Sequence, residues 1–261
     1  MKIGVCAKVV PDTAAQIKTK ADGSGIETAG LKWVVNPYDS NAIEAAVQLV
    51  DAKKAASAHG YAVGDDSAVN TLRPGGLAVG LTDLTLINDP ALSDSDHLGA
   101  AKALAAAIKA DGIGLVLCGK VSVDDDAVQV PAMLAELLGW PLVSMVNKLD
   151  VDGDAFSATR AVGGGVEEEV SGSLPAVITC DKGLNTPRYA KLPDIVKSKR
   201  KPVNTKSLSD LGLSAADVAA KVEVSAYGGP PARPAGRILE GDLPAQVNEL
   251  VRLLRDEAKV I

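Results

Sequence analysis

Apolar and polar residues alternate in blocks along the first half of the chain, and these blocks predict strands followed by helices. Continuous apolar runs at residues 2–10 and 112–118 are typical of buried strands. Two weaker runs, at residues 76–81 and 84–87, are also strand-like. Residues 55–75 are small, polar and glycine-rich, so we expect them to form an extended surface insertion.

Three segments carry apolar residues at helical spacing next to residues that cap helices. They are residues 41–54, capped by Asp39 or Ser40; residues 96–110, capped by Asp94 or Ser95; and residues 125–138, ending at Gly139 with Pro141 just beyond. Strands that alternate with helices are the pattern of a doubly wound α/β fold. Because the strands are continuously apolar, we expect a mostly parallel sheet covered on both faces.

The pattern changes after residue 142, where short strands joined by turns replace the alternation of strand and helix. This change predicts an antiparallel hairpin group added to the sheet. The expected strands are residues 143–149, 156–162, 166–170 and 176–180.

The C-terminal part of the chain differs again in composition. Residues 197–236 are rich in Pro, Gly and charge and indicate an extended arm that lies on another surface. Residues 243–260 are predicted to form an amphipathic helix. We therefore divide the chain into an α/β domain over residues 1–196 and an arm plus helix over residues 197–261.

Composition excludes several classes of protein. The net charge of −6 argues against general nucleic-acid binding, and no apolar run reaches the roughly 20 residues that a membrane span needs. The chain begins MKIGVCAKVV, which is typical of a strand and leaves no room for a signal or transit peptide before it. We expect a cytoplasmic protein.

The few cysteines and histidines limit the kinds of catalytic or metal site that the chain can form. Cys6, Cys118 and Cys180 are far apart in sequence and each lies in an apolar run, so buried reduced thiols are expected. His59 and His97 lie in polar, loop-like stretches without an evident metal or triad partner. Zinc sites, thiol proteases and Ser-His-Asp hydrolases are therefore not predicted.

Three segments are placed where a doubly wound sheet binds ligands, beyond the carboxyl ends of strands and at helix N-termini. They are residues 6–10, residues 36–39 and residues 119–130. In the third, GKVSVDDDAVQV, the backbone N–H groups of residues 126–129 would point at a bound anion. Nucleotide binding there competes with a capped structural helix, because Asp124, Asp125 and Asp126 repel phosphate unless they point away or act as caps.

Two other motifs have competing interpretations. The run GGGVEEE at residues 163–169 is a tight hairpin between strands rather than a phosphate loop or metal site. A dense group of cations indicates a docking surface for an acidic protein, with nucleic-acid binding or a solvated face as alternatives. Its members are Lys182, Arg188, Lys191, Lys197, Lys199, Arg200 and Lys201.

The sequence resembles the beta subunit of electron transfer flavoprotein over nearly its whole length. The matching stretches include VCAKVVPD, LKWVVNPYDSNAIEAAVQL, LVLCGKVSVDDDAVQ and LLGWP. The longest is ATRAVGGGVEEEVSGSLPAVITCDKGLNTPRYAKLPDIVKSKRK. LSDLGL and AYGGPPARPAG, before the final helix, match the C-terminal arm of that family.

The resemblance implies an electron carrier without bond chemistry of its own. Such a beta chain pairs with an alpha subunit that holds most of the FAD, and it binds AMP structurally in its α/β domain. The carrier takes electrons from flavin dehydrogenases, such as acyl-CoA dehydrogenases, to an acceptor such as a quinone reductase. The arm and C-terminal helix would pack on the alpha subunit.

The resemblance also assigns residues. Tyr38 would face the flavin, and Leu192 would anchor a recognition loop, residues 180–202, on partner dehydrogenases. The other implied partner-binding residues are Tyr189, Pro193, Ile195, Lys197, Lys199 and Arg200. The implied cofactor-binding residues are Cys6, Ala7, Asn36, Pro37, Tyr38, Asp39, Leu81, Gly119, Lys120, Val121, Ser122, Val123, Asp124, Asp125, Asp126, Ala127, Val128, Gln129 and Val130.

Some features depart from the family pattern. The segment after the second strand is short, so Gly80 or Leu81 is only the nearest equivalent of the usual nucleotide contact there. Val128 and Val130 stand where mitochondrial-type members have Asn and Thr, which removes a hydroxyl contact to phosphate. AMP is favoured, and the alternatives are a bifurcating type with a second FAD in place of AMP, a subunit that has lost its nucleotide, and a nucleotide-binding α/β enzyme.

Overall fold

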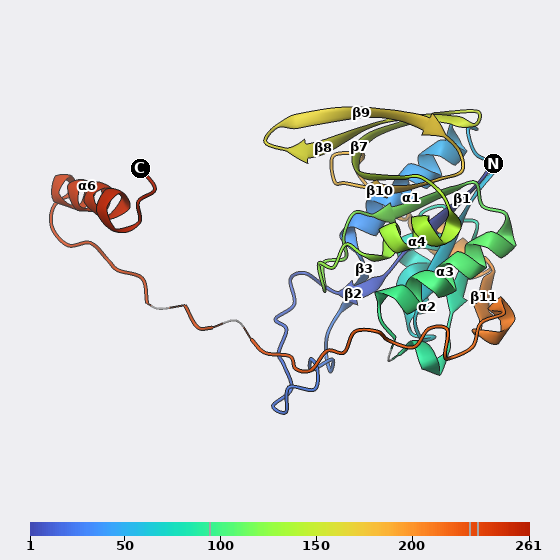
Figure 1. Ribbon diagram of the computed structural model, residues 1–261, viewed down its shortest axis with the longest axis horizontal. Helices are drawn as coiled ribbons and strands as arrows, with labels where there is room; N and C mark the ends of the chain where they lie inside the picture. Colours follow the sequence, from blue (N-terminus) through green and yellow to red (C-terminus); the bar gives the residue numbers. More distant parts are fainter. Residues whose placement is uncertain (94, 230, 234) are drawn as a thin grey trace. The chain divides into compact units, whose positions relative to one another are not determined.

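The computed structural model describes every residue except 94, 230 and 234, and it contains a large central sheet (Figure 1). The nine strands lie in the order β11-β5-β4-β1-β6-β10-β7-β8-β9. All neighbours from β11 to β7 pair in parallel, whereas β8 and β9 are antiparallel additions at one edge. The strands are β1 Lys2–Cys6, β4 Ser57–Val63, β5 Asp83–Ile87, β6 Leu115–Gly119, β7 Leu142–Asp152, β8 Ala155–Gly163, β9 Val166–Ser173, β10 Ala176–Cys180 and β11 Val203–Lys206.

Helices cover both faces of this sheet, which confirms the predicted doubly wound α/β fold. Helix α1 packs on one face, and α3 and α4 pack on the other. The helices are α1 Pro37–Asp51, α2 Ala68–Leu72, α3 His97–Asp111, α4 Val130–Leu138, α5 Leu192–Ser198 and α6 Leu243–Arg252. Shorter elements are the antiparallel pair β2 Val9–Pro11 and β3 Trp33–Val35, and the single turns η1 Arg73–Leu77, η2 Pro90–Leu92, η3 Ser209–Leu211 and η4 Leu253–Glu257.

Alanine lets the helices approach the sheet closely. Ala42 and Ala46 of α1 are fully buried on one face, and Ala103 and Ala107 of α3 are fully buried on the other. Each pair lies one helical turn apart, so each marks the face that meets the sheet. The scarcity of aromatic residues therefore reflects a core built by close backbone approach and aliphatic side chains.

The predicted surface insertion at residues 55–75 is wrong, because β4 lies near the centre of the sheet between β1 and β5. Polar His59 fits there because Asp83, its register partner on β5, accepts a hydrogen bond from it. Gly60 suits the close packing here, since a Cβ would lie 3.1 Å from the Cδ1 atoms of both Leu81 and Leu84, closer than ordinary van der Waals contact. Residues 76–81 are not a strand but a turn, in which the Gly76 carbonyl accepts from the N–H groups of residues 79, 80 and 81.

Other details also differ from prediction. The first helix begins at Pro37 with Asn36 at its N-cap position, instead of at residue 41 after Asp39 or Ser40, and it ends at Asp51. The strand at residues 176–180 is β10, which is parallel to both neighbours rather than part of an antiparallel group. The third helix begins at Val130 instead of residue 125, because Asp126 and Val128 have φ values of 52° and 55° that no α-helix contains. Asp96 rather than the predicted Ser95 caps α3, by accepting from Gly99 N. The other predicted cap, Asp94, lies outside the described residues.

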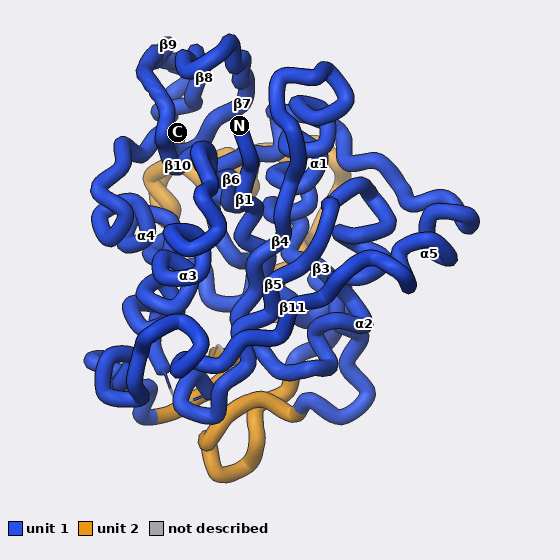
Figure 2. The backbone as a smooth tube through the Cα atoms, turned by 90° about the vertical axis from the view of Figure 1, so that its right-hand side faces the viewer, with its two compact units in different colours: residues 1–17, 28–225 blue, residues 18–27, 226–261 orange. Residues whose placement is uncertain are grey.

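The chain forms two compact units, coloured separately in Figure 2: residues 1–17 with 28–225, and residues 18–27 with 226–261. This division differs from the predicted boundary after residue 196, because β11 pairs with β5 and belongs to the sheet. In the second unit, Tyr227 N donates to Gly23 O. The helix predicted over residues 243–260 is shorter: α6 ends at Arg252 and continues as η4 to Glu257, with Leu243, Val247 and Leu250 exposed. The AYGGPPARPAG turn includes residues 230 and 234, which lie outside the described residues.

Two further predictions concern the state of the cysteines and membrane crossing. Cys6, Cys118 and Cys180 are all buried and free, as predicted. In the part of the chain that the structure describes, no helix has both the length and the apolar character needed to cross a bilayer.

Candidate nucleotide site

A cavity of about 410 Å³ opens beyond the carboxyl ends of β1, β4 and β6. The strand order reverses between β1 and β6, since β4 and β5 lie on one side of β1 and β6 lies on the other. This is the position where doubly wound sheets bind ligands. Its lining is Cys6, Ala7, Lys8, Asn36, Asp39, Tyr61, Ala62, Val63, Ser95, Asp96, His97, Ala100, Leu104, Cys118, Gly119, Lys120, Val121, Ser122, Asp125, Ala127, Val128, Gln129, Val130, Pro131, Val222 and Val224.

Asp39 joins the two strand ends at the floor of the cavity. Its carboxylate accepts from Lys8 N at 2.7 Å and from Gly119 N at 3.0 Å. Burial raises the pKa of Asp39 to about 6, against the opposing effect of these hydrogen bonds. The first turn of α1 is thereby fastened to both β1 and β6.

The titration of Asp39 gives the first prediction. Because its pKa rises from 3.8 to about 6 on folding, the folded chain holds this proton more tightly than the unfolded chain. The group's contribution to stability is therefore present below pH 4 and is lost as pH rises to about 6, a change of about 3 kcal/mol. Carbon NMR of the Asp39 carboxyl should give a midpoint near pH 6. Asp65, whose pKa is lowered by hydrogen bonds from Ser67, serves as the control. A midpoint for Asp39 at or below 4 would contradict the prediction.

Asn36 holds the loop at residues 119–130 over the cavity. Its side-chain amide donates to Val121 O at 2.9 Å, and its Oδ1 accepts from Val123 N at 3.3 Å. Asn36 is itself buried, so these bonds form away from water. The Asn-Pro pair that begins α1 thus also positions the loop after β6.

Two of the three acidic residues of this loop, Asp124 and Asp125, lie against basic side chains that line the cavity. Lys8 Nζ lies 2.8 Å from Asp124 and 2.9 Å from Asp125, and His97 Nε2 lies 3.0 Å from Asp125. Burial alone would raise the pKa of Asp125, but the bonds from His97 and Lys8 lower it to about 2. Two of the three aspartates are therefore paired, which weakens the objection that they would repel phosphate.

The backbone of the loop supplies fewer free donors than expected. Asp126 N donates to Ser122 O at 2.9 Å, and Ala127 N donates to Asp125 Oδ1 at 3.1 Å. Of the four N–H groups predicted to face an anion, those of Val128 and Gln129 therefore remain, and both residues line the cavity.

Val128 carries backbone strain, which gives a second prediction. A β-branched residue at φ 55° is strained by about 1–2 kcal/mol, and its side chain is 59% exposed, so it contributes little burial. Val128→Gly should therefore raise the free energy of unfolding by about 0.5–1 kcal/mol, after the extra entropy of the unfolded glycine is subtracted. Urea denaturation measures this effect. Val224→Gly, at an exposed position without positive φ, should not stabilise. Equal effects would show that Val128 is unstrained.

Most of the predicted cofactor-binding residues line the cavity, but six do not. Pro37, Tyr38, Val123, Asp124 and Asp126 flank it in sequence, whereas Leu81 is buried in the apolar cluster beneath α1. The sequence missed the wall formed by β4, because that strand was interpreted as an insertion. It also missed Val222 and Val224, whose segment is fixed by Ser95 Oγ donating to Val218 O and by Lys221 N donating to Asp96.

Tyr38 lies beside the cavity rather than in it. Lys120 Nζ and Lys182 Nζ lie 5.1 Å and 5.2 Å from the centre of its ring, within range of cation–π attraction. Lys120 also forms an ion pair with Asp181 at 2.8 Å. The half-buried phenol ring therefore lies in a positively charged environment formed by these two lysines.

The segment after β10 combines an anchored base with an exposed tip. Arg188 forms a two-pronged ion pair with buried Glu44 at 2.8 Å and 2.9 Å and bonds Asp51 at 2.9 Å. Beyond this anchor, the apolar side chains of Tyr189 and Leu192 are 95% and 80% exposed. Large apolar groups that point into water on a fixed base are typical of a binding surface.

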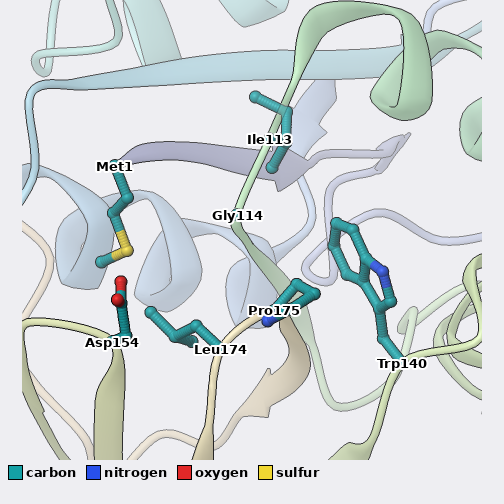
Figure 3. A pocket seen from close by; sticks show the side chains of 7 residues that line it. All are labelled: Met1, Ile113, Gly114, Trp140, Asp154, Leu174 and Pro175. Carbon is teal, nitrogen blue, oxygen red and sulfur yellow. The ribbon is translucent and has the colours of Figure 1, made fainter.

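A second hollow, of about 290 Å³, lies at the opposite, amino ends of β1 and β10 (Figure 3). Its lining is Met1, Ile113, Gly114, Trp140, Asp154, Leu174 and Pro175. These side chains are mostly apolar, with one carboxylate, and none belongs to the predicted site. The cavity beyond β1 and β6 is therefore the better candidate for a nucleotide.

Comparison with known proteins identifies the family. A family model described as the electron transfer flavoprotein domain matches residues 24–211. The chain is 38% identical to the electron transfer flavoprotein subunit beta of Bradyrhizobium diazoefficiens and 37% identical to that of Bacillus subtilis, with full coverage of both chains in each case. The chain belongs to the electron transfer flavoprotein beta-subunit family.

The match to this family extends to distant organisms. The electron transfer flavoprotein subunit beta of Bos taurus is 35% identical over 95% of this chain and 97% of its own length. The resemblance found in the sequence is thereby confirmed, and membership in an electron-carrier family is established for the whole chain.

Proposed function

We propose that this chain is one half of a heterodimeric single-electron carrier. It would pair with an electron transfer flavoprotein alpha subunit that holds most of the FAD, and would place Tyr38 near the flavin. The positively charged surrounding of Tyr38 supports this role, because reduced flavin carries negative charge that nearby lysines stabilise. Three reduced thiols support a reducing compartment such as the cytoplasm.

Co-expression with an alpha-type subunit tests the carrier role. We expect a yellow heterodimer whose flavin is reduced by a flavin dehydrogenase and reoxidised by a quinone reductase or another acceptor. A colourless, active monomer would instead support a nucleotide-binding enzyme.

We further propose that the cavity beyond β1 and β6 holds AMP as a structural ligand. The observation that carries this proposal is the cavity's place at the reversal of strand order. Its residues fit a mononucleotide: apolar Ala62, Val63 and Leu104 suit a base, whereas Gln129 and the N–H of Val128 suit a phosphate. A volume near the small end of ligand pockets favours AMP over a second FAD. Bound nucleotide would stabilise the folded chain by mass action.

The ligand can be identified directly. Purified heterodimer is denatured, and the released small molecules are separated and identified by mass spectrometry. We expect one AMP and one FAD per heterodimer. Two FAD molecules would support the bifurcating type, and FAD without any second adenine nucleotide would support a subunit that has lost its ligand.

Docking on dehydrogenases is proposed for the segment from Cys180 to Pro202. Its exposed Leu192 belongs to a segment that also carries Lys191, Lys197 and Lys199, so charge would steer the encounter and the apolar tip would supply specificity. The rigid base formed by Arg188 and Glu44 would reduce the entropy lost on binding.

A further inference from the structure

Three side chains at the amino ends of β4 and β5 form a continuous hydrogen-bonded chain. Ser57 Oγ lies 2.7 Å from His59 Nε2, and His59 Nδ1 lies 2.9 Å from Asp83 Oδ1. The sequence alone gave His59 no partner, because Asp83 is 24 residues away. The parallel register of β4 and β5 places the two residues directly opposite each other.

The chemistry of the three groups fixes the direction of these bonds. An ionised carboxylate only accepts hydrogen bonds, so His59 Nδ1 donates to Asp83. In neutral His59 the lone pair is then on Nε2, and the Ser57 hydroxyl donates to it. A serine hydroxyl that donates to an imidazole oriented by a carboxylate is the arrangement of an activated nucleophile.

The site is rigid and reachable. Ser57 and His59 are two residues apart on one strand, so their side chains lie on the same face of the sheet. The side chains of His59 and Asp83 are 17% and 23% exposed, and Ser57 is half-buried, so a small reagent can approach. Lys2 lies opposite Ser57 in the register of β1 and β4, and its ammonium donates to Asp111 O at 3.1 Å.

We propose that Ser57 is an acylation site that accepts an acyl group from a small activated ester or thioester. Ser57 Oγ bonds to the carbonyl carbon as the bond from that carbon to the alcohol or thiol breaks. The hydroxyl proton passes to His59 Nε2 and from there to the departing oxygen or sulfur, so the products are acyl-Ser57 and a neutral alcohol or thiol. The site lies at the opposite end of β4 from the nucleotide cavity, and the proposal does not depend on that cavity's ligand.

Acetylation by p-nitrophenyl acetate tests the proposal on the full chain. Peptide mass spectrometry should locate one acetyl group on Ser57, formed far faster than on Ser67. Ser67 is an exposed serine that bonds to Asp65 without a histidine, so it is a matched internal control. Because general-base catalysis contributes about 100-fold or more, His59→Gln should slow acetylation of Ser57 by about 100-fold.

Ser57→Ala should abolish the adduct, and Asp83→Asn should slow its formation. Circular dichroism and thermal melting establish that each variant is folded. The comparison between Ser57 and Ser67 in the unchanged protein remains decisive if a variant fails to fold. Absence of acetyl-Ser57, or acetylation of Ser57 no faster than of Ser67, would overturn the proposal and leave the three side chains a purely structural hydrogen-bond chain.

Discussion

Gly119→Ala should lower the free energy of unfolding by about 4 kcal/mol. A Cβ on this residue would lie 2.3 Å from Asp39 Oδ1 and 2.8 Å from both Asp39 N and the carbonyl carbon of Tyr38. Two of these atoms belong to the backbone of α1, so no side-chain rotation relieves the clash. The first turn of α1 must move away from β6, which strains the core and breaks the bond from Gly119 N to buried Asp39.

Urea denaturation of the heterodimer measures this loss, and the nucleotide content measured after purification should fall with it. Gly114→Ala is the matched control on the same segment, because its Cβ would find only Met1 Cβ at an ordinary 3.6 Å. This control should change stability by less than about 1 kcal/mol. If Gly119→Ala were equally mild, the fastening of α1 to β6 through Asp39 would not matter to the site.

Leu192→Ala should slow electron transfer from a partner dehydrogenase by about 10-fold or more when the carrier is below saturation. Leu192 is 80% exposed in the free chain, so its side chain contributes little to folding. Its burial at a binding surface can contribute about 2 kcal/mol or more to the free energy of binding. The FAD content and the melting temperature should stay unchanged. Added salt should slow the encounter in both forms, because salt screens the charge of the lysines in this segment.

Stopped-flow reduction of the carrier by the dehydrogenase gives the rate. Val166→Ala is the control, since Val166 is 58% exposed on β9, outside the proposed docking segment. Loss of FAD in Leu192→Ala would show that the segment has a structural role. An unchanged rate would show that dehydrogenases bind elsewhere.

The sequence predicted much of the fold where local signals were strong. Its continuous apolar runs predicted β1 and β6, and a weaker run predicted β5. The predicted helix end at Gly139 is also correct, and this glycine has a φ of 70°. Prediction failed at β4, whose SAHGYAV sequence is too polar and too small to indicate a central strand. That strand is stable there only because β1 and β5 complete its hydrogen bonds and Asp83 satisfies His59.

The candidate site was likewise predicted where local motifs were strong and missed where distant segments meet. Motifs pointed to Asn36, Asp39 and the loop after β6, because these segments follow strands or begin helices, and the cavity brings all three together. No motif indicated Lys8 and His97 as partners of the acidic loop, since they approach it from the segment after β1 and from the start of α3, across large sequence separations. Tertiary pairing also revealed that two of the four N–H groups expected to face an anion, those of Asp126 and Ala127, bond to other groups of the loop.

The sequence by itself determined the family, the alternation of strand and helix, and the buried state of the three cysteines, because each depends on residues that are close in the chain. Tertiary structure decided which distant side chains meet. The parallel register of β4 and β5 placed Asp83 against His59, and the packing of α1 on β6 placed Asp39 on Gly119. Such contacts depend on the register and packing of separate elements, which no local pattern specifies.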